Sequence, residues 1–467
     1  MKKNNNRRKK WKRLLVATIL VGALLLFSVI YTIQKSGGLS LIGTMRTEVL
    51  YLVGIFLLLI PVLLVVLLVS LLTARVRPQK QSPVSEGADA PTETVTHRVE
   101  ATPEETETGE RFCMLSAIDR KKNSYGHSSY DKGITLEVFC DDFRNYAASR
   151  LKLYYDIEDI RRFVAGMAVS KLVILQGMSG TGKTSLAHAF GSYTDNPSTV
   201  IPVQPMWKER TDLVGYYNEF TKRFNETLLL EKMYEANYSK DMYVTVLDEM
   251  NIARVEYYFA EFLSLLELPN PEERYIDVVS DRWESDPQQL RDGRIKLPEN
   301  MWFVGTANND DSTFAISDKV YDRAMVLNLD AKSERFAAPM TGKRQISAEQ
   351  FGDLVKKAEK EYGVSRRNRS RLEALDRYLI EHFHITFGNR IMKQIFTYIP
   401  VYVACGGDEL VALDDIISKK IIRKLETQNP IYLRNSVDGL LSYLDELFGT
   451  DRMPLCKEYI RRLERNA

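Results

Sequence analysis

The chain has 467 residues, too many for one ordinary domain, and typical domain sizes predict two or three separate units. Its 64 Lys and Arg residues nearly balance 62 Asp and Glu residues, and the net charge of +2 excludes a nucleic-acid-binding polycation. The four cysteines are widely spaced and form no CxxC pair, which argues against a zinc site and a disulfide-rich fold and favours reduced thiols.

Two long apolar segments follow a basic N-terminus. Residues 1–13 contain eight Lys and Arg residues and are expected to form a cytoplasmic tail. Residues 14–33 and 50–74 contain no charged side chain and are each long enough to cross a bilayer, which predicts a transmembrane hairpin over residues 14–74. A cleaved signal peptide is the alternative for the first segment, but its apolar run is too long and no small-residue cleavage site follows it. Because basic residues concentrate outside the hairpin, we expect an integral membrane protein with its N-terminus and its C-terminal remainder in the cytoplasm.

Residues 75–134 are expected to form a flexible linker. From Arg75 to about Arg111 the chain is rich in Pro, Glu, Thr and Ser and has few large apolar residues, so it cannot bury enough surface to fold. Residues 112–134 are ambiguous in composition and are assigned to the same linker.

A short apolar run over residues 171–176 leads into the sequence GMSGTGKT at residues 177–184. Glycines there let successive backbone N–H groups point at phosphate oxygens, and the helix that follows adds the positive end of its dipole. Lys183 is expected to neutralise the β- and γ-phosphates and Thr184 to hold Mg²⁺. The residues predicted to bind the nucleotide are Gly177, Ser179, Gly180, Thr181, Gly182, Lys183, Thr184 and Ser185.

Two further apolar strands end in polar residues. Residues 243–247 lead into Asp248 and Glu249, which places two acids at the carboxyl edge of a parallel sheet. Asp248 suits the Mg²⁺ shell, and Glu249 suits the base that orients the attacking water. The strand at residues 301–307 ends in Asn308, which could touch the water or the γ-phosphate; a turn-forming Asn is the alternative.

Together these motifs resemble the McrB-like, dynein-related branch of the AAA+ ATPases. The resemblance implies a ring-forming ATPase that uses ATP, or GTP, together with Mg²⁺. It covers roughly residues 135–425 and is carried by LDEMNIARVEYYFAEFLSLLE at 247–267, WKERTDLVGYYN at 207–218, GTAN at 305–308 and SDKVYDRA at 317–324.

The resemblance also implies roles for two arginines. The family's trans-acting arginine finger falls on Arg323, which would stabilise charge on the γ-phosphate held by a neighbouring subunit; a surface Arg paired with Asp322 is the alternative. The family's second sensor arginine, on the helical lid, would match Arg390, although a basic residue at the start of a helix has ordinary explanations. Family analogy also allows part of residues 276–295 to project as a hairpin toward a substrate or a central pore.

Beyond about residue 345 the pattern becomes helical. Apolar positions recur at three-to-four spacing over residues 372–383, 391–403 and 410–425. We therefore expect an α/β fold with the parallel sheet of an AAA+ P-loop NTPase at residues 135–340. A helical lid and a C-terminal helical extension are expected at residues 341–467, and the transmembrane hairpin precedes the whole.

Three functions are compatible with these features. The leading prediction is a membrane-tethered ring in which hydrolysis at subunit interfaces remodels a partner protein or assembly. A nucleotide-controlled switch or scaffold is the first alternative, and the NTPase motor of a restriction-like or anti-phage defence system is the second. A nucleic-acid partner is not expected, because the sequence contains no nuclease motif or DNA-reading domain, but DNA-stimulated hydrolysis would support one. The expected partners are further copies of the chain, the lipid bilayer and an unidentified protein.

Overall fold

The computed structural model of the protein describes residues 110–308, 313–330 and 333–466. All the described residues belong to one of the two units into which the chain divides, the one that begins at Glu104. The two predicted membrane spans lie outside the described residues. Within these residues, no helix is both long and apolar enough to cross a bilayer.

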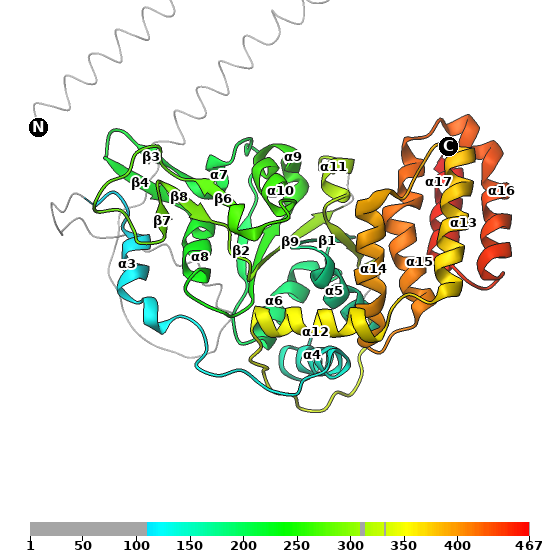
Figure 1. The fold of residues 1–467 in the computed structure, drawn as a ribbon, viewed down its shortest axis with the longest axis horizontal. Helices are drawn as coiled ribbons and strands as arrows, with labels where there is room; N and C mark the ends of the chain where they lie inside the picture. Colours follow the sequence, from blue (N-terminus) through cyan, green and yellow to red (C-terminus); the bar gives the residue numbers. More distant parts are fainter. Residues whose placement is uncertain (1–109, 309–312, 331–332, 467) are drawn as a thin grey trace, which may run out of the picture. The chain divides into compact units, whose positions relative to one another are not determined.

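A five-stranded parallel sheet forms the centre of the described unit (Figure 1). The strand order is β10-β1-β9-β5-β2, so strands that are neighbours in space are distant in sequence. The parallel α/β sheet predicted from the sequence is confirmed. Its strands are β1 (Leu172–Gly177), β2 (Thr199–Pro202), β5 (Tyr243–Asp248), β9 (Met301–Asn308) and β10 (Met325–Asn328).

The central strands are mostly apolar because both faces of the sheet are covered. In β1, Val173 and Leu175 join the core on one face, whereas Leu172 and Ile174 join the core on the other. The first face is covered by α5 (Ile157–Val169) and α6 (Lys183–Tyr193), and α4 (Leu136–Leu151) packs on these two helices. The opposite core includes residues of α3 (Met114–Arg120), α7 (Thr211–Val214), α8 (Leu228–Ala236), α9 (Val255–Tyr258), α10 (Ala260–Leu266) and α11 (Asp318–Tyr321).

Two small antiparallel sheets are inserted into this frame. The first is a hairpin of β3 (Gly215–Asn218) and β4 (Arg223–Glu226), which the sequence patterns did not predict. The second lies where a hairpin was expected over residues 276–295, and it has three strands in the order β6-β8-β7. These are β6 (Tyr275–Asp277), β7 (Leu290–Arg291) and β8 (Arg294–Lys296); the 3-10 segments are η2 (Lys122–Ser124), η3 (Met250–Ile252), η4 (Pro271–Glu273) and η5 (Ile422–Thr427).

The segment from residue 110 to residue 134 belongs to the folded unit. Phe112 is 1% exposed and packs its ring against that of Phe224, with centroids 5.0 Å apart. The Glu226 carboxylate accepts backbone N–H bonds from the start of α3, including one from Leu115 at 2.8 Å. The prediction that the flexible linker extends to residue 134 is therefore wrong, because the few large apolar residues of this segment find a partner surface.

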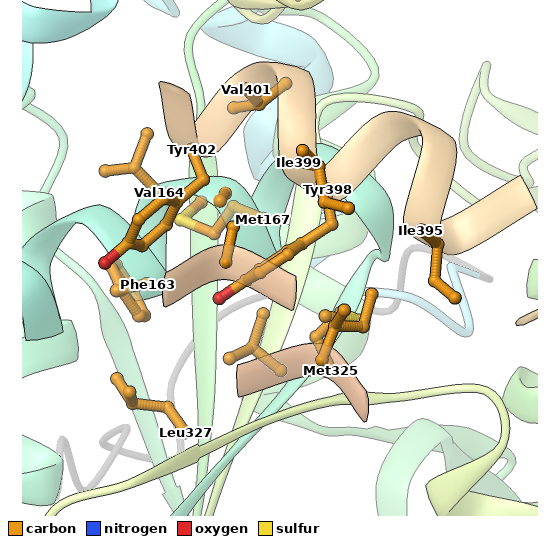
Figure 2. Packing of buried hydrophobic residues seen from close by; sticks show 14 of the residues in the cluster. Phe163, Val164, Met167, Met325, Leu327, Ile395, Tyr398, Ile399, Val401 and Tyr402 are labelled. Carbon is orange, nitrogen blue, oxygen red and sulfur yellow. The ribbon is translucent and has the colours of Figure 1, made fainter. Parts of the chain in front are cut away.

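The C-terminal helices share a core with the α/β part. The three predicted helices fall within α13, α14 and the pair α15–η5. Figure 2 shows Tyr398, Ile399 and Tyr402 of α14 packed with side chains of α5 and of β10, so the helical region is docked along the β10 edge of the sheet. The helices of this region are α12 (Ala348–Glu361), α13 (Arg366–Phe383), α14 (Gly388–Ala404), α15 (Glu409–Lys420), α16 (Pro430–Phe448) and α17 (Pro454–Asn466).

Candidate functional site

The loop between β1 and α6 has a backbone that only glycine accommodates at two positions. Gly177 has φ of 143°, and a Cβ on it would lie 2.2 Å from the carbonyl oxygen of Leu329. Gly182 has φ of 96° and lies against the Tyr155 ring, whose hydroxyl donates to the Gly182 carbonyl at 3.0 Å. Ser179 and the third loop glycine, Gly180, are exposed at the tip. The glycines therefore produce the tight turn that exposes backbone N–H groups in front of a helix N-terminus.

The lysine of this loop is held against it. Lys183 is only 6% exposed, and its Nζ donates to the carbonyl oxygens of Gly177 at 2.9 Å and Met178 at 2.7 Å. The Thr181 hydroxyl also donates to the Met178 carbonyl, at 3.0 Å. Ser185 follows in the first turn of α6 and is half-buried. A buried ammonium inside a loop of N–H donors fits the phosphates of a nucleoside triphosphate.

The acid pair after β5 is joined to this loop by hydroxyl groups. The Thr184 hydroxyl donates to Asp248 Oδ1 at 2.7 Å, and the Thr306 hydroxyl donates to the same oxygen at 2.9 Å. Thr306 Oγ1 also accepts the backbone N–H of Glu249 at 2.8 Å. Glu249 has φ of 52° and an exposed side chain. One hydroxyl therefore orients the half-buried Asp248 carboxylate and the backbone of the exposed Glu249.

The residues predicted to bind Mg²⁺ suit that ion. The Thr184 hydroxyl and the Asp248 carboxylate are hard oxygen donors that meet at 2.7 Å, in front of the phosphate-binding loop. Mg²⁺ is usually held in proteins by few side-chain oxygens together with waters and substrate phosphates. The two side chains fit a metal that is completed by the triphosphate.

Asn308 lies beside the first residue of the loop. It is the last residue of β9 and pairs in register with Gly177 of β1. Its carbonyl oxygen accepts from Asn251 Nδ2 at 2.9 Å, which ties it to the segment after the acid pair. It also lines a cleft of about 750 Å³ at this edge of the sheet, together with Gln176 and Asn328. The structure thus brings Asn308 to the same edge as the loop and the two acids.

Arg323 lies at the amino-terminal end of the parallel strands, opposite the end that carries the loop and the two acids. Its carbonyl oxygen accepts from the Ser170 hydroxyl at 2.8 Å, just before β1 begins. Its guanidinium donates to Glu267 at 2.7 Å and to the carbonyl of Lys319 at 2.8 Å, so the alternative pairing with Asp322 is not found in the structure. The six residues of β1, spanning roughly 20 Å of extended chain, separate it from its own phosphate-binding loop.

Arg390 lies beside Arg323 and away from the loop. Its guanidinium pairs with Glu267 at 2.5 Å, so one carboxylate binds both arginines. Arg323 and Arg390 line a second cleft, of about 480 Å³, together with Lys171 and Arg274. Arg390, which matches the family's second sensor arginine, therefore lies away from the loop of its own chain, because α14 docks on α5 and β10. At the loop edge, the helical region instead presents Lys419, Arg423 and Arg462.

Two residues of the site were missed at the level of sequence. Thr306 is a polar residue facing the acids from within a buried apolar strand, and its position in the GTAN segment was the available signal. Tyr155 is buried against the loop but lies 22 positions before it in the chain, and no local pattern indicated this contact.

A parallel sheet with a phosphate-binding loop after β1 and an acid pair after the strand two places away defines the class of protein as a P-loop nucleoside triphosphatase. Residues 172–324 match the family model described as AAA domain (dynein-related subfamily). The chain therefore carries an AAA+ domain, with the ATPase function and the nucleotide use that this domain implies. Residues 345–467 match a second model, described as Domain of unknown function (DUF8727).

Many solved structures are similar to parts of the chain, and two of them illustrate the likeness. A candidate ATPase from Cytophaga hutchinsonii is 13% identical, with a TM-score of 0.42, over 70% of this chain and 96% of that chain. A full-length MCM homolog from Methanopyrus kandleri is 9% identical, with a TM-score of 0.32, over 62% of this chain and 56% of that chain. No curated protein matches the sequence.

Proposed function

We propose that the protein hydrolyses ATP, with GTP as the alternative nucleotide, at interfaces between subunits of a ring. The observation that carries this proposal is the separation of Arg323 from the loop of its own chain by the length of β1. An arginine at that edge can reach a triphosphate only across a subunit interface. Heterologous contacts of this kind close into rings when the rotation between subunits allows it.

The chemistry follows from the positions of the side chains. Bound Mg²⁺ neutralises charge on the phosphates, and its ligands from this chain would be Thr184 and Asp248. The Lys183 ammonium moves from the loop carbonyls to the β- and γ-phosphates. The exposed Glu249 carboxylate orients a water for attack on the γ-phosphate and takes its proton. The neighbouring subunit's counterpart of Arg323 stabilises the charge that develops.

We further propose that the ring is anchored in the membrane by the hairpin over residues 14–74 and that it remodels a partner protein or assembly. The uncharged length of residues 14–33 and 50–74 supports the anchor. The McrB-like assignment within the dynein-related subfamily is part of the same proposal. It rests on the motif segments, and the partner is an unidentified protein.

Two substitutions test the hydrolytic site. Lys183→Ala should abolish nucleotide binding, whereas Glu249→Gln should retain binding and lower turnover by at least about 100-fold. The measurements are steady-state phosphate release and nucleotide affinity of the full chain in detergent or vesicles. Turnover at the wild-type rate in Lys183→Ala would show that this loop is not part of the hydrolytic site.

The Glu249→Gln and wild-type proteins together separate the three functions. Affinity purification of this variant from solubilised membranes with ATP should retain a substrate protein if the ring remodels a partner. A persisting output of the bound form without turnover would favour the switch or scaffold. Stimulation of wild-type hydrolysis by DNA would favour the defence-system motor.

A further inference from the structure

The C-terminal helical region holds the backbone on both sides of Arg323. Lys420, the last residue of α15, is 2% exposed and directs its ammonium into the segment that carries the finger. Its Nζ donates to the carbonyl oxygens of Tyr321 at 2.7 Å and Asp322 at 3.4 Å, and to that of Ala324. Three N–H donors therefore meet three carbonyls that flank the arginine from both sides.

Burying an ammonium is costly, which makes this contact more than a surface pairing. Burial lowers the pKa of Lys420 to about 7, and the nearby Asp322 carboxylate opposes that shift. The carbonyls of Tyr321 and Asp322 lie at the end of α11, where helix carbonyls lack partners of their own. Lys420 thus satisfies acceptors that would otherwise be unpaired, and by doing so it fixes the chain direction at residue 323.

Two other elements of the helical region contact the same segment. Gln394 of α14 donates through Nε2 to the Asp322 carbonyl at 3.2 Å. Arg423 of η5 pairs with Asp318 at 2.7 Å, and its guanidinium lies 4.0 Å from the ring centre of Tyr321. Contacts from α14, α15 and η5 therefore converge on residues 318–324.

The base of these contacts is a packed core. Tyr398 and Ile399 of α14 are fully buried against α5 and β10 (Figure 2). On the other side, the Ser170 hydroxyl at the end of α5 donates to the carbonyl of Arg323 itself. The backbone of Arg323 is held between α5 and the helical region, while its side chain is held by Glu267, a partner that an incoming phosphate could displace.

We propose that Lys420 is the positioning residue of the finger and that the helical region of residues 345–467 thereby sets catalysis in the neighbouring subunit. The inference rests on the proposed function, since it requires that Arg323 acts across an interface. Lys420 touches no nucleotide. It acts through the backbone of the finger, and a displacement on the order of 1 Å at such a group can cost about 100-fold in rate.

The test is complementation between two full-length proteins with opposite defects. Lys420→Met should lower turnover at least about tenfold with its own nucleotide affinity unchanged, because its loop is intact and only its finger is misplaced. Lys183→Ala has the reverse defect, because its loop is impaired and its finger is intact. Mixed oligomers of the two should regain activity, since about a quarter of the interfaces in an equal mixture join an intact loop to an intact finger. Arg323→Ala mixed with Lys183→Ala is the reference, and Lys356→Met, an exposed lysine of α12, is the matched control with wild-type activity.

Each result has a defined meaning. Recovery of Lys420→Met to the level of the Arg323→Ala reference supports the inference. Recovery of Arg323→Ala without recovery of Lys420→Met overturns the inference and leaves the interfacial mechanism standing. Failure of both mixtures overturns the interfacial mechanism, and the inference with it.

A second variant covers the case in which Lys420→Met does not fold. Gln394→Ala removes one contact with the Asp322 carbonyl and should reduce turnover several-fold. Its activity should also be restored by Lys183→Ala in mixed oligomers. A folded Gln394→Ala protein whose loss of turnover is not restored in this way would contradict the positioning role.

Discussion

Asp248 is oriented by two hydroxyl groups before any ion or phosphate reaches it. Thr184 comes from the helix after the loop, and Thr306 comes from the neighbouring strand β9. The second contact also fixes Glu249, because its backbone N–H donates to the same threonine oxygen. A single hydroxyl, that of Thr306, therefore sets the geometry of both acids.

Thr306→Val removes this hydroxyl at nearly constant volume. Turnover should fall on the order of tenfold, because supporting partners of catalytic and metal-binding groups typically contribute that much. Nucleotide affinity should change little, since the loop is untouched. Steady-state phosphate release and a binding titration measure the two effects, with Ser264→Ala on the exposed face of α10 as control. Parental turnover in Thr306→Val would contradict the role assigned to the hydroxyl.

At the scale of elements, the segment of residues 110–134 is attached to the α/β part by two kinds of contact. Apolar burial acts at its start, where Phe112 packs against Phe224. Charged hydrogen bonds act further on, where the His127 ring bonds Asp241 at 2.9 Å and Asp195 at 3.2 Å. The two kinds of contact predict different responses to mutation.

Phe112→Ala should lower the free energy of unfolding of the folded unit by about 3 kcal/mol, the cost of emptying a filled aromatic site. Urea denaturation followed by circular dichroism measures the change. Met114, an exposed residue of the same segment, supplies the control Met114→Ala, which should be nearly neutral. If both variants changed the free energy of unfolding equally little, residues 110–134 would have to be assigned to the flexible linker.

His127→Ala should destabilise the protein more in acid than in base. Burial lowers the pKa of His127, but hydrogen bonds to Asp241 and Asp195 outweigh it, so the net pKa is raised above 6.5. A raised histidine pKa contributes stability that is complete below the unfolded value and is lost as pH rises through the folded value. The same carboxylates have other partners: Tyr130 donates to Asp241, and Lys343 pairs with Asp195.

The measurement is the thermal midpoint of wild type and variant at pH 5.5 and pH 9. The difference in thermal midpoint between wild type and His127→Ala should be larger at pH 5.5 than at pH 9. His188→Ala, at an exposed position of α6, should give a difference that does not grow in acid. If His127→Ala lowered the thermal midpoint equally at both pH values, the ring would act by packing alone.

At the scale of the whole molecule, the sequence of the first unit predicts how the protein is held in the cell. Residues 14–33 and 50–74 each carry enough uncharged length for a span. The full chain should therefore stay in the membrane pellet after alkaline extraction, while introducing Asp into the middle of each span should release a fraction of it. Quantitative release of wild type by alkali would reject the anchor and leave the interfacial ATPase to be judged by its own tests.

The sequence alone determined the features that lie within one short stretch of chain. The loop from Gly177 to Ser185, the acids Asp248 and Glu249, and the helical periodicity of the C-terminal region are local patterns, and the structure brings the loop and the acids together at one edge of the sheet. Only the tertiary structure decided the rest. Thr306 and Tyr155 meet the site through strand order and helix packing, and Arg390 was carried to the opposite edge by the docking of α14. The physical reason is that backbone geometry is specified by neighbouring residues, whereas the meeting of distant side chains depends on which apolar faces pack together.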